Sequence, residues 1–461
     1  MSSNGVVDAV GEELTALLTR LGELADLPTD PVGDGAACID RIALLERARG
    51  ALAAAQHTAM VAFGRAQVEA QLDQIATGRL DPEKLGRGIG DQIALAAHVS
   101  PHVADRRLTV ARALATDLPC TRALLVSGRI SEYLAEQIVS LTSHLDPETR
   151  RLVDKQAAEA GLDELGRKAA VAAVKKLAYE ADPVGFLQRG RTARKDRRVA
   201  LRPAPDTMAV LSGLLPVEQG VACIAALRQH ADSLIATGAS GGRSRDQILA
   251  DTLVERLTGQ TRAEDVDVEV GIVLPLDALT DPDSPKTGEL VGHGPLPGGI
   301  VVELLRRTGG KRWWRRLFAH PVHGGLVGGD PQRRLFDGFL ATLITWRDRA
   351  WCREAFCGAP IRHLDHITGK RAGGPTSFGN GRGNCVRHNE DKELPGWHHE
   401  VLHDGLGDQP HTVQTTTPTG HTYTSRAGPV SSGLPPGSSP RPPRGPRTRR
   451  RPPRPRGPGV P

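Results

Sequence analysis

The residues best suited to chemistry lie in one segment, residues 352–392. Three of the six cysteines of the chain fall inside it, in the order Cys352-x4-Cys357 and then Cys385-x2-His388. Two close pairs of Cys or His side chains from separate turns are the usual donors of a tetrahedral zinc ion. The spacing therefore predicts a structural Zn²⁺ bound by these four residues. The alternatives are a disulfide between Cys352 and Cys357, or unpaired thiols beside a surface histidine.

A second group of polar residues, Asp365, His366, Asn380 and Asn389, lies between and just after these cysteines. Carboxylate and amide oxygens are hard donors, which favour Mg²⁺ over zinc. A histidine next to them, with a pKa near neutrality, can take a proton from water. The two groups of residues therefore do not suit the same metal, and the second could bind a hard cation beside a histidine base.

Residues 365–367 (Asp-His-Ile), the glycine-rich loop after them and residues 385–392 resemble the HNH (ββα-metal) nuclease motif. The Cys-x4-Cys pair ahead of them is similar to the zinc-stapled form of that motif. In that family two antiparallel strands and a helix hold one divalent ion against the scissile phosphate. The resemblance implies a small ββα-metal module with nuclease activity on DNA.

Carried over by position, the resemblance makes His366 the general base that activates the attacking water. It makes Asp365 and Asn389 the ligands of the catalytic ion, Mg²⁺ or Mn²⁺. Asn380 matches the middle asparagine of the motif, which braces the loop and orients the imidazole. Asn384 also flanks the glycines, and the spacing favours Asn380.

The segment departs from the family pattern at two places and carries one further charge. The fourth zinc ligand is usually cysteine, whereas this chain has His388, whose imidazole also binds zinc well. The proline that often follows Asp-His-Ile is replaced by residues 368–370, Thr-Gly-Lys. Lys392 lies three residues after Asn389, on the same helix face, from which it can reach a phosphate oxygen. The departures leave a rival hypothesis open, in which the module keeps its zinc and binds DNA without cleaving it.

Composition and charge limit the class of protein. The chain has 461 residues, enough for two or three domains, with 39% hydrophobic but only 3% aromatic residues. Alanine and leucine replace the aromatic residues, which favours packed helices. The net charge is +6, but residues 441–456 contain eight arginines and no acid, so the basicity belongs mainly to the C-terminal end. That end can attract nucleic acid phosphates, while the charge of the remainder says little about DNA.

No feature of the sequence directs the chain into or across a membrane. The first residues include acids and lack a long apolar core, unlike a signal peptide, and no run of about 18 apolar residues occurs. Six scattered cysteines, three of them assigned to zinc, do not make a disulfide framework. We therefore expect a soluble, cytoplasmic protein with no membrane partner.

Most of the chain is predicted to be helical. Apolar residues recur at intervals of three and four over residues 40–72, and helix start signals occur at Ser100-Pro101, Ser131 and Asp146-Pro147. Further helices are predicted at residues 217–235, 245–257 and 335–346. The expected β structure is a hairpin around residues 197–214, a strand at residues 266–274 and strand character in the threonine-rich residues 412–425.

These elements predict three parts. Residues 1–330 form a mainly α N-terminal domain of unknown function, with a small β element near residues 197–214 and 266–275. Residues 331–427 form the small zinc-stapled ββα-metal (HNH) module with its flanking segments, and residues 428–461, rich in proline and arginine, form a disordered C-terminal tail. Residues 311–318, KRWWRRLF, either contact nucleic acid or pack their tryptophans inward.

The layout as a whole resembles the thirteen-E-twelve repeat family of actinobacteria, abundant in mycobacteria, in which a long helical domain of unknown function precedes an HNH module. The resemblance covers residues 44–428 and is carried by residues 197–214, 244–257, 290–295, 346–397 and 417–421. It implies a metal-dependent HNH endonuclease that hydrolyses DNA, and a homodimer would suit cleavage of both strands. A third hypothesis is a helical interaction protein whose arginine-rich tail alone touches DNA.

Overall fold

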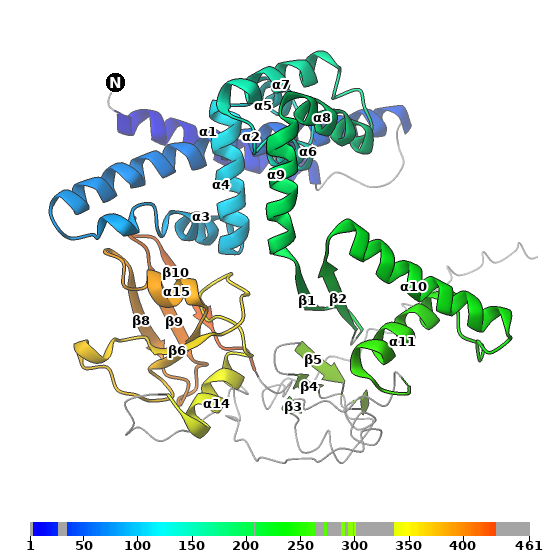
Figure 1. Cartoon of the computed structure of the whole chain (residues 1–461). Coiled ribbons are helices and arrows are strands. Elements are labelled where there is room, and N and C mark those ends of the chain that lie inside the picture. The colour runs from blue at the N-terminus through cyan, green and yellow to red at the C-terminus, as the bar shows by residue number, and fades with distance from the viewer. Residues whose placement is uncertain are drawn as a thin grey trace, which may run out of the picture. The chain divides into compact units, whose positions relative to one another are not determined.

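The structure is a computed structural model that describes residues 3–25, 35–206, 208–262, 272–273, 287–290, 294–297, 299–300 and 336–429 (Figure 1). These residues are mainly helical and contain small antiparallel sheets. They belong to two compact units, one made of Met1–Ala59 and Val110–Asp182, the other of Met60–Thr109 and Pro183–Pro461. Within the described ranges, no helix combines the length and the apolarity that crossing a lipid bilayer requires.

The first unit is helical throughout its described residues. Its core consists of buried apolar side chains that include Leu114, Leu118, Leu125 and Ile138. Its helices are α1 (Ser3–Ala25), the first part of α2 (Gly35–Ala76), the end of α4 (Pro101–Thr116), α5 (Pro119–Val126), α6 (Glu132–Leu141), α7 (Pro147–Glu159) and α8 (Arg167–Ala181).

The predicted helix starts are confirmed at their capping residues. Ser131 accepts a hydrogen bond from the amide of Leu134 at 3.3 Å. Asp146 accepts two hydrogen bonds from amides in the first turn of α7, both at 3.0 Å. Each cap pairs with backbone amides that have no partner inside the helix, and α4 begins at Pro101 as predicted. Local sequence signals were sufficient here because a cap depends only on its near neighbours.

One turn of the first unit requires glycine. Gly128, between α5 and α6, has a φ of +65°, a conformation that L side chains rarely adopt. A Cβ at this position would lie 2.2 Å from the backbone oxygen of Arg47 in α2. A Cβ on Gly50, further along α2, would lie 3.1 Å from the Cα of Gly128. The two glycines therefore allow α2 to pack directly on the backbone of the α5–α6 turn.

We predict that Gly128→Ala destabilises the protein by more than about 3 kcal/mol, because left-handed strain adds to a clash with the backbone. The matched variant is Gly161→Ala in the same unit, where φ is +68° but no atom lies closer than 3.7 Å to the added Cβ. It should cost only the left-handed strain, about 1–2 kcal/mol. Urea unfolding followed by circular dichroism measures both losses. Equal losses would show that the contact with α2 does not constrain the fold.

The second unit begins with a helical part. It contains the end of α2, the 3₁₀ turn η1 (Pro82–Lys84), α3 (Ile89–Ala97) and the first part of α4. Its core is built on Met60, Ile89, Ile93 and Leu108. Asp91, in the first turn of α3, is also buried, although a carboxylate in such a place needs polar partners.

The middle of the second unit confirms the predicted hairpin and two predicted helices. β1 (Arg198–Pro203) pairs with β2 (Ala209–Leu214) in antiparallel register. α10 (Val217–Ala236) and α11 (Arg245–Thr258) agree closely with the predicted ranges, and Ser244 and Gln247 cap α11 reciprocally. The hairpin is preceded by α9 (Pro183–Ala193) and the 3₁₀ turn η2 (Arg194–Asp196).

A short sheet of order β3-β4-β5 follows, made of β3 (Ile272–Val273), β4 (Thr287–Leu290) and β5 (Gly294–Pro297). Of the strand predicted at residues 266–274, only residues 272–273 are among those that the structure describes. Residues 311–318, the domain boundary at residue 330 and the tail after residue 429 lie outside the described residues. These expectations stay predictions.

The C-terminal part carries the predicted metal ligands. α14 packs on the loop before β7 through Leu340, Leu343, Ile344 and Phe378. β6 and β7 form an antiparallel pair that α15 follows, and a separate sheet has the order β10-β9-β8. The elements are α14 (Gly338–Arg347), β6 (His363–His366), the 3₁₀ turn η3 (Lys370–Ala372), β7 (Gly381–Asn384), α15 (Val386–Asp391), β8 (His398–His403), β9 (Thr412–Thr416) and β10 (Thr422–Arg426).

Candidate metal centre and active site

The first two cysteines lie on a tight turn after α14. Trp351 and Pro360 form an antiparallel bridge across this turn. The amide of Cys352 donates a hydrogen bond to the carbonyl of Ala359 at 2.6 Å. The chain therefore folds back on itself between the two cysteines and brings Cys357 close to Cys352.

The second pair of donors lies at the start of α15. Cys385 is the N-cap residue of this helix, and its sulfur accepts a hydrogen bond from the amide of His388 at 3.5 Å. The amide of Arg353, in the cysteine turn, donates to the carbonyl of Gly383 in β7 at 2.8 Å. Backbone hydrogen bonding thus holds the cysteine turn beside the strand that leads into α15.

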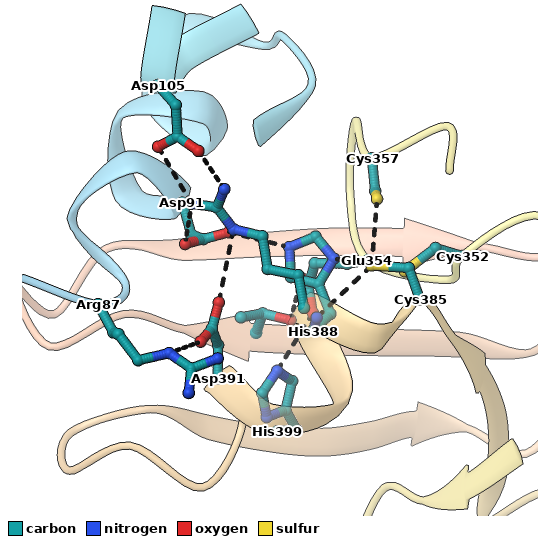
Figure 2. Close-up of polar contacts among 12 residues, drawn as sticks. Arg87, Asp91, Asp105, Cys352, Glu354, Cys357, Cys385, His388, Asp391 and His399 are labelled. Carbon is teal, nitrogen blue, oxygen red and sulfur yellow. Dashed lines mark hydrogen bonds and ion pairs between the residues drawn. The ribbon is translucent and has the colours of Figure 1, made fainter. Parts of the chain in front are cut away.

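The four predicted zinc donors converge (Figure 2). The Sγ atoms of Cys352, Cys357 and Cys385 and a ring nitrogen of His388 lie within 4.8 Å of one another, and all four residues are buried. The Sγ atoms of Cys357 and Cys385 are 3.9 Å apart, and His388 Nδ1 is 3.4 Å from the Sγ atoms of Cys352 and Cys385. Neighbouring donors of a tetrahedral zinc ion are about 3.5–3.8 Å apart. The cluster therefore fits a bound zinc ion.

The chemistry of the donors also fits a cation. The three cysteines are free, so the alternative disulfide between Cys352 and Cys357 is not formed. Hydrogen bonds donated by those two thiols lower the pKa of Cys385, while the pKa of Cys352 and that of Cys357 are raised. A thiolate is the form of cysteine that binds metal. The buried cluster could therefore bind a structural metal such as zinc, as the spacing predicted.

We predict that the purified protein contains about one zinc ion per chain and that Cys357→Ser loses it during dialysis against a chelator, because three remaining donors hold zinc weakly. Cys223→Ser, which changes an exposed free cysteine of α10, is the matched control and should keep its zinc. Elemental analysis by mass spectrometry measures the metal content. Zinc retained by Cys357→Ser would contradict the assignment of this cluster.

A buried ion pair fixes β7 against α14. Arg347, which is 1% exposed, donates to Asp348 and to the carbonyls of Phe378 and Gly381 at 2.6 and 2.7 Å. Asp348 accepts a further hydrogen bond from the amide of Gly383 at 2.9 Å. Burial disfavours the Asp348 carboxylate, but the neighbouring Arg347 guanidinium lowers its pKa below the ordinary value. The loop and strand after the predicted base are therefore held by paired charges.

His366, the predicted base, ends β6 and is 9% exposed. Its Nε2 lies 2.9 Å from Thr376 Oγ1, and its ring packs against Phe336 with centroids 4.7 Å apart. Its Nδ1 lies 3.7 Å from Asp365 Oδ1. Burial lowers the pKa of His366, although the Asp365 charge opposes this effect. Burial therefore favours the neutral imidazole, which is the state that a general base needs.

Asn380 braces the loop between β6 and β7. Its Nδ2 donates to the carbonyls of Thr368 and Pro375 at 3.0 and 2.8 Å, and its Oδ1 accepts the Thr368 amide at 2.9 Å. The side chain of Asn384 is buried and has no hydrogen-bond partner among the described residues. The structure places Asn380, and not Asn384, across the loop that carries Thr376.

The predicted ligands of the catalytic ion lie on β6 and α15. Asp365 Oδ1 accepts the amide of His366 at 2.7 Å, and Asp365 Oδ2 lies 2.5 Å from Lys392 Nζ. Lys392 also donates to the carbonyl of His366 at 3.3 Å. Asn389 Oδ1 is buried and, in the part of the chain that the structure describes, has no hydrogen-bond partner. This unpaired oxygen suits a cation ligand, whereas the Asp365 carboxylate is already neutralised by Lys392.

Side chains from the helical part of the second unit contact α15, and no sequence signal could have identified them. They are Arg87, Asp91 and Asp105. Arg387 donates to Asp91 through Nε and Nη2, both at 2.6 Å, and also to Asp105. Arg87 pairs with Glu390. Asp91 is 296 positions from Arg387 in the chain and looks like any acidic residue in the first turn of a helix. The centre therefore includes residues that only the tertiary structure reveals.

Residues 44–348 match a family described as a domain of unknown function (DUF222). The chain belongs to the DUF222 family. This domain is the N-terminal domain of the family that the sequence resembles, in which it is usually paired with an HNH module. The match ends before Cys352, so the Cys/His cluster lies outside the DUF222 domain, while α3 with Asp91 lies inside it. No curated protein and no solved structure matches the chain.

Proposed function

We propose that this DUF222 protein is a metal-dependent HNH endonuclease that hydrolyses DNA phosphodiester bonds. The observation that supports the proposal most is the environment of His366, a buried imidazole at the end of β6, between Asp365 and Thr376, whose pKa burial lowers. The order of β6, loop, β7 and α15 is the order expected of a ββα-metal module. The Cys/His cluster agrees with its zinc-stapled form.

Proton transfer begins at the imidazole of His366. Because Nε2 is held by Thr376 Oγ1, Nδ1 is the nitrogen that takes the proton of the attacking water. Burial has lowered the pKa of the ring, so the ring need not lose a proton first. The Asp365 carboxylate, 3.7 Å from Nδ1, then stabilises the imidazolium that forms.

Asp365 and Asn389 would hold the catalytic Mg²⁺ or Mn²⁺. When bound, this ion neutralises charge on the phosphoryl oxygens and on the leaving 3′-oxygen. Asn389 offers an unpaired Oδ1, whereas Asp365 must first release Lys392. The released Lys392 ammonium is then available to a phosphate oxygen of the substrate.

DNA is the proposed partner, and the arginines of residues 441–456 would add salt-sensitive, sequence-independent affinity for its phosphates. One catalytic site per chain cuts one strand at a time, so a homodimer would serve cleavage of both strands. A cytoplasmic location would give the enzyme access to DNA.

We predict that the protein nicks supercoiled plasmid in the presence of Mg²⁺ or Mn²⁺. His366→Ala should slow nicking by about 10²–10⁴-fold, because the general base is lost, while zinc content and DNA binding stay unchanged. His398→Ala is the matched control, since His398 is exposed on β8, and it should cleave at the original rate. Gel quantification of the nicked plasmid measures the rates. Equal rates in the two variants would show that His366 is not the base.

A catalytically degenerate, zinc-stapled DNA-binding protein is the second candidate. The observation that favours it is the Asp365–Lys392 ion pair. Lys392 already neutralises the carboxylate that the catalytic ion would need as a ligand. Such a protein would bind zinc and DNA but would not nick plasmid at any concentration of Mg²⁺ or Mn²⁺. The plasmid assay therefore separates the two candidates, whereas DNA binding alone does not.

A further inference from the structure

The carboxylate of Asp91 is in a place where charge is costly. It lies in the first turn of α3, next to the buried core residue Ile89, and is itself only 1% exposed. A carboxylate this deeply buried needs charged or hydrogen-bonding partners. Those partners come from α15, the helix that begins at the Cys/His cluster.

His388 connects Asp91 to the cluster. Its Nδ1 faces the sulfurs of Cys352 and Cys385, at 3.4 Å from each. Its Nε2, on the other side of the ring, lies 3.3 Å from Asp91 Oδ1. Figure 2 shows the labelled imidazole between the Asp91 carboxylate and the cysteines. One ring nitrogen therefore faces the sulfurs of the cluster, and the other faces the Asp91 carboxylate.

We propose that Asp91 is a positioning residue of the zinc centre, although it lies in the DUF222 domain, outside the segment that supplies the ligands. Asp91 accepts a hydrogen bond from Nε2–H of His388, which fixes the tautomer whose Nδ1 lone pair points toward the metal. A carboxylate behind a metal-binding imidazole also makes that imidazole a stronger donor. The proposal rests on the zinc cluster alone and is independent of any nuclease activity.

Arg387 is the charged partner that compensates the buried Asp91 carboxylate. Its Nε and Nη2 donate to Oδ1 and Oδ2 of Asp91, both at 2.6 Å, and its Nη1 donates to Asp105. The bidentate pair offsets the cost of burying the carboxylate, because both of its oxygens accept charge-assisted hydrogen bonds. Arg387 directly precedes His388, so one turn of α15 presents both partners to Asp91.

The backbone of α3 is shaped to allow this contact. A Cβ on Gly90 would lie 1.9 Å from Asp105 Oδ1 and 3.0 Å from Arg387 Nη2. Any larger residue at position 90 would therefore displace the side chains that hold Asp91. The absence of a side chain there lets α3 and the start of α4 meet α15 closely.

The arrangement links zinc affinity to the docking of α3. If Asp91 stabilises the zinc-bound state through His388, then bound zinc must stabilise the docked state of α3 by the same amount. The DUF222 domain would then contribute to the metal centre of the module that follows it. This is a structural reason for the two parts to occur in one chain.

The test is the zinc affinity of the full-length protein, measured by competition with a chromophoric chelator. Asp91→Asn keeps the size of the side chain but removes its charge, and it should weaken zinc binding by about 10- to 100-fold. Asp105→Asn is the matched control. Asp105 pairs with the same Arg387, but its side chain is 47% exposed, so its loss should change the affinity by less than about fivefold.

A second readout separates positioning of the imidazole from simple loss of docking. Arg387→Gln removes the pairing between α15 and both aspartates but leaves Asp91 facing His388. The visible spectrum of the Co²⁺-substituted protein reports the geometry of the donors around the metal. We expect it to change in Asp91→Asn and to stay unchanged in Arg387→Gln and Asp105→Asn.

A weakened affinity and an altered Co²⁺ spectrum that are confined to Asp91→Asn would support the proposal. Equal zinc affinities in Asp91→Asn and Asp105→Asn would overturn it, and so would equal losses in Asp91→Asn and Arg387→Gln. If Asp91→Asn does not fold, Asp91→Glu decides. Recovery of zinc affinity by this longer carboxylate supports the proposal, and failure to recover it in a folded protein rejects it.

Discussion

The convergence of four donor atoms at one buried point is the constraint on which the C-terminal part of this protein depends. Around the cluster the apolar packing consists of little more than the three cysteines and Ala359. A segment with so little hydrophobic burial gains cohesion when a metal crosslinks it. Because Cys385 directly follows β7 and caps α15, fixing the cluster also fixes the strand and helix beside the proposed catalytic residues.

Buried ion pairs and hydrogen bonds also hold the C-terminal part in one conformation. Glu354, deep inside this part, lies 3.2 Å from both Arg382 and His399 and accepts a hydrogen bond from Thr415 at 2.7 Å. Together with the Arg347–Asp348 pair, this network adds buried polar contacts to the apolar packing of Leu343, Ile344 and Phe378. Buried polar networks specify one geometry because each unpaired member is costly. The loop and strand that follow the proposed base are therefore positioned by buried ion pairs and hydrogen bonds as well as by apolar packing.

The features that the sequence predicted correctly depend on short-range patterns. Ser131 caps its helix through a neighbour three residues away, and each pair of metal donors lies within one short turn, Cys352-x4-Cys357 and Cys385-x2-His388. Asp91 could not be predicted, because its role arises only when α3 meets α15. Lys392 shows the same limit, since its position suggested a phosphate contact but not its ion pair with Asp365. Residue type and spacing identify donors, whereas tertiary packing decides their partners.

Hydrogen–deuterium exchange of the full-length protein, with zinc bound and after chelation, tests the central claim most directly. If the cluster holds this part of the chain together, the amides of β7, α15 and α3 should lose protection together when zinc is removed. Helices α5 to α8, which have their own apolar core, should keep theirs. Unchanged protection of α15 and α3 in the zinc-free protein would contradict the account, because the fold would then not depend on the metal.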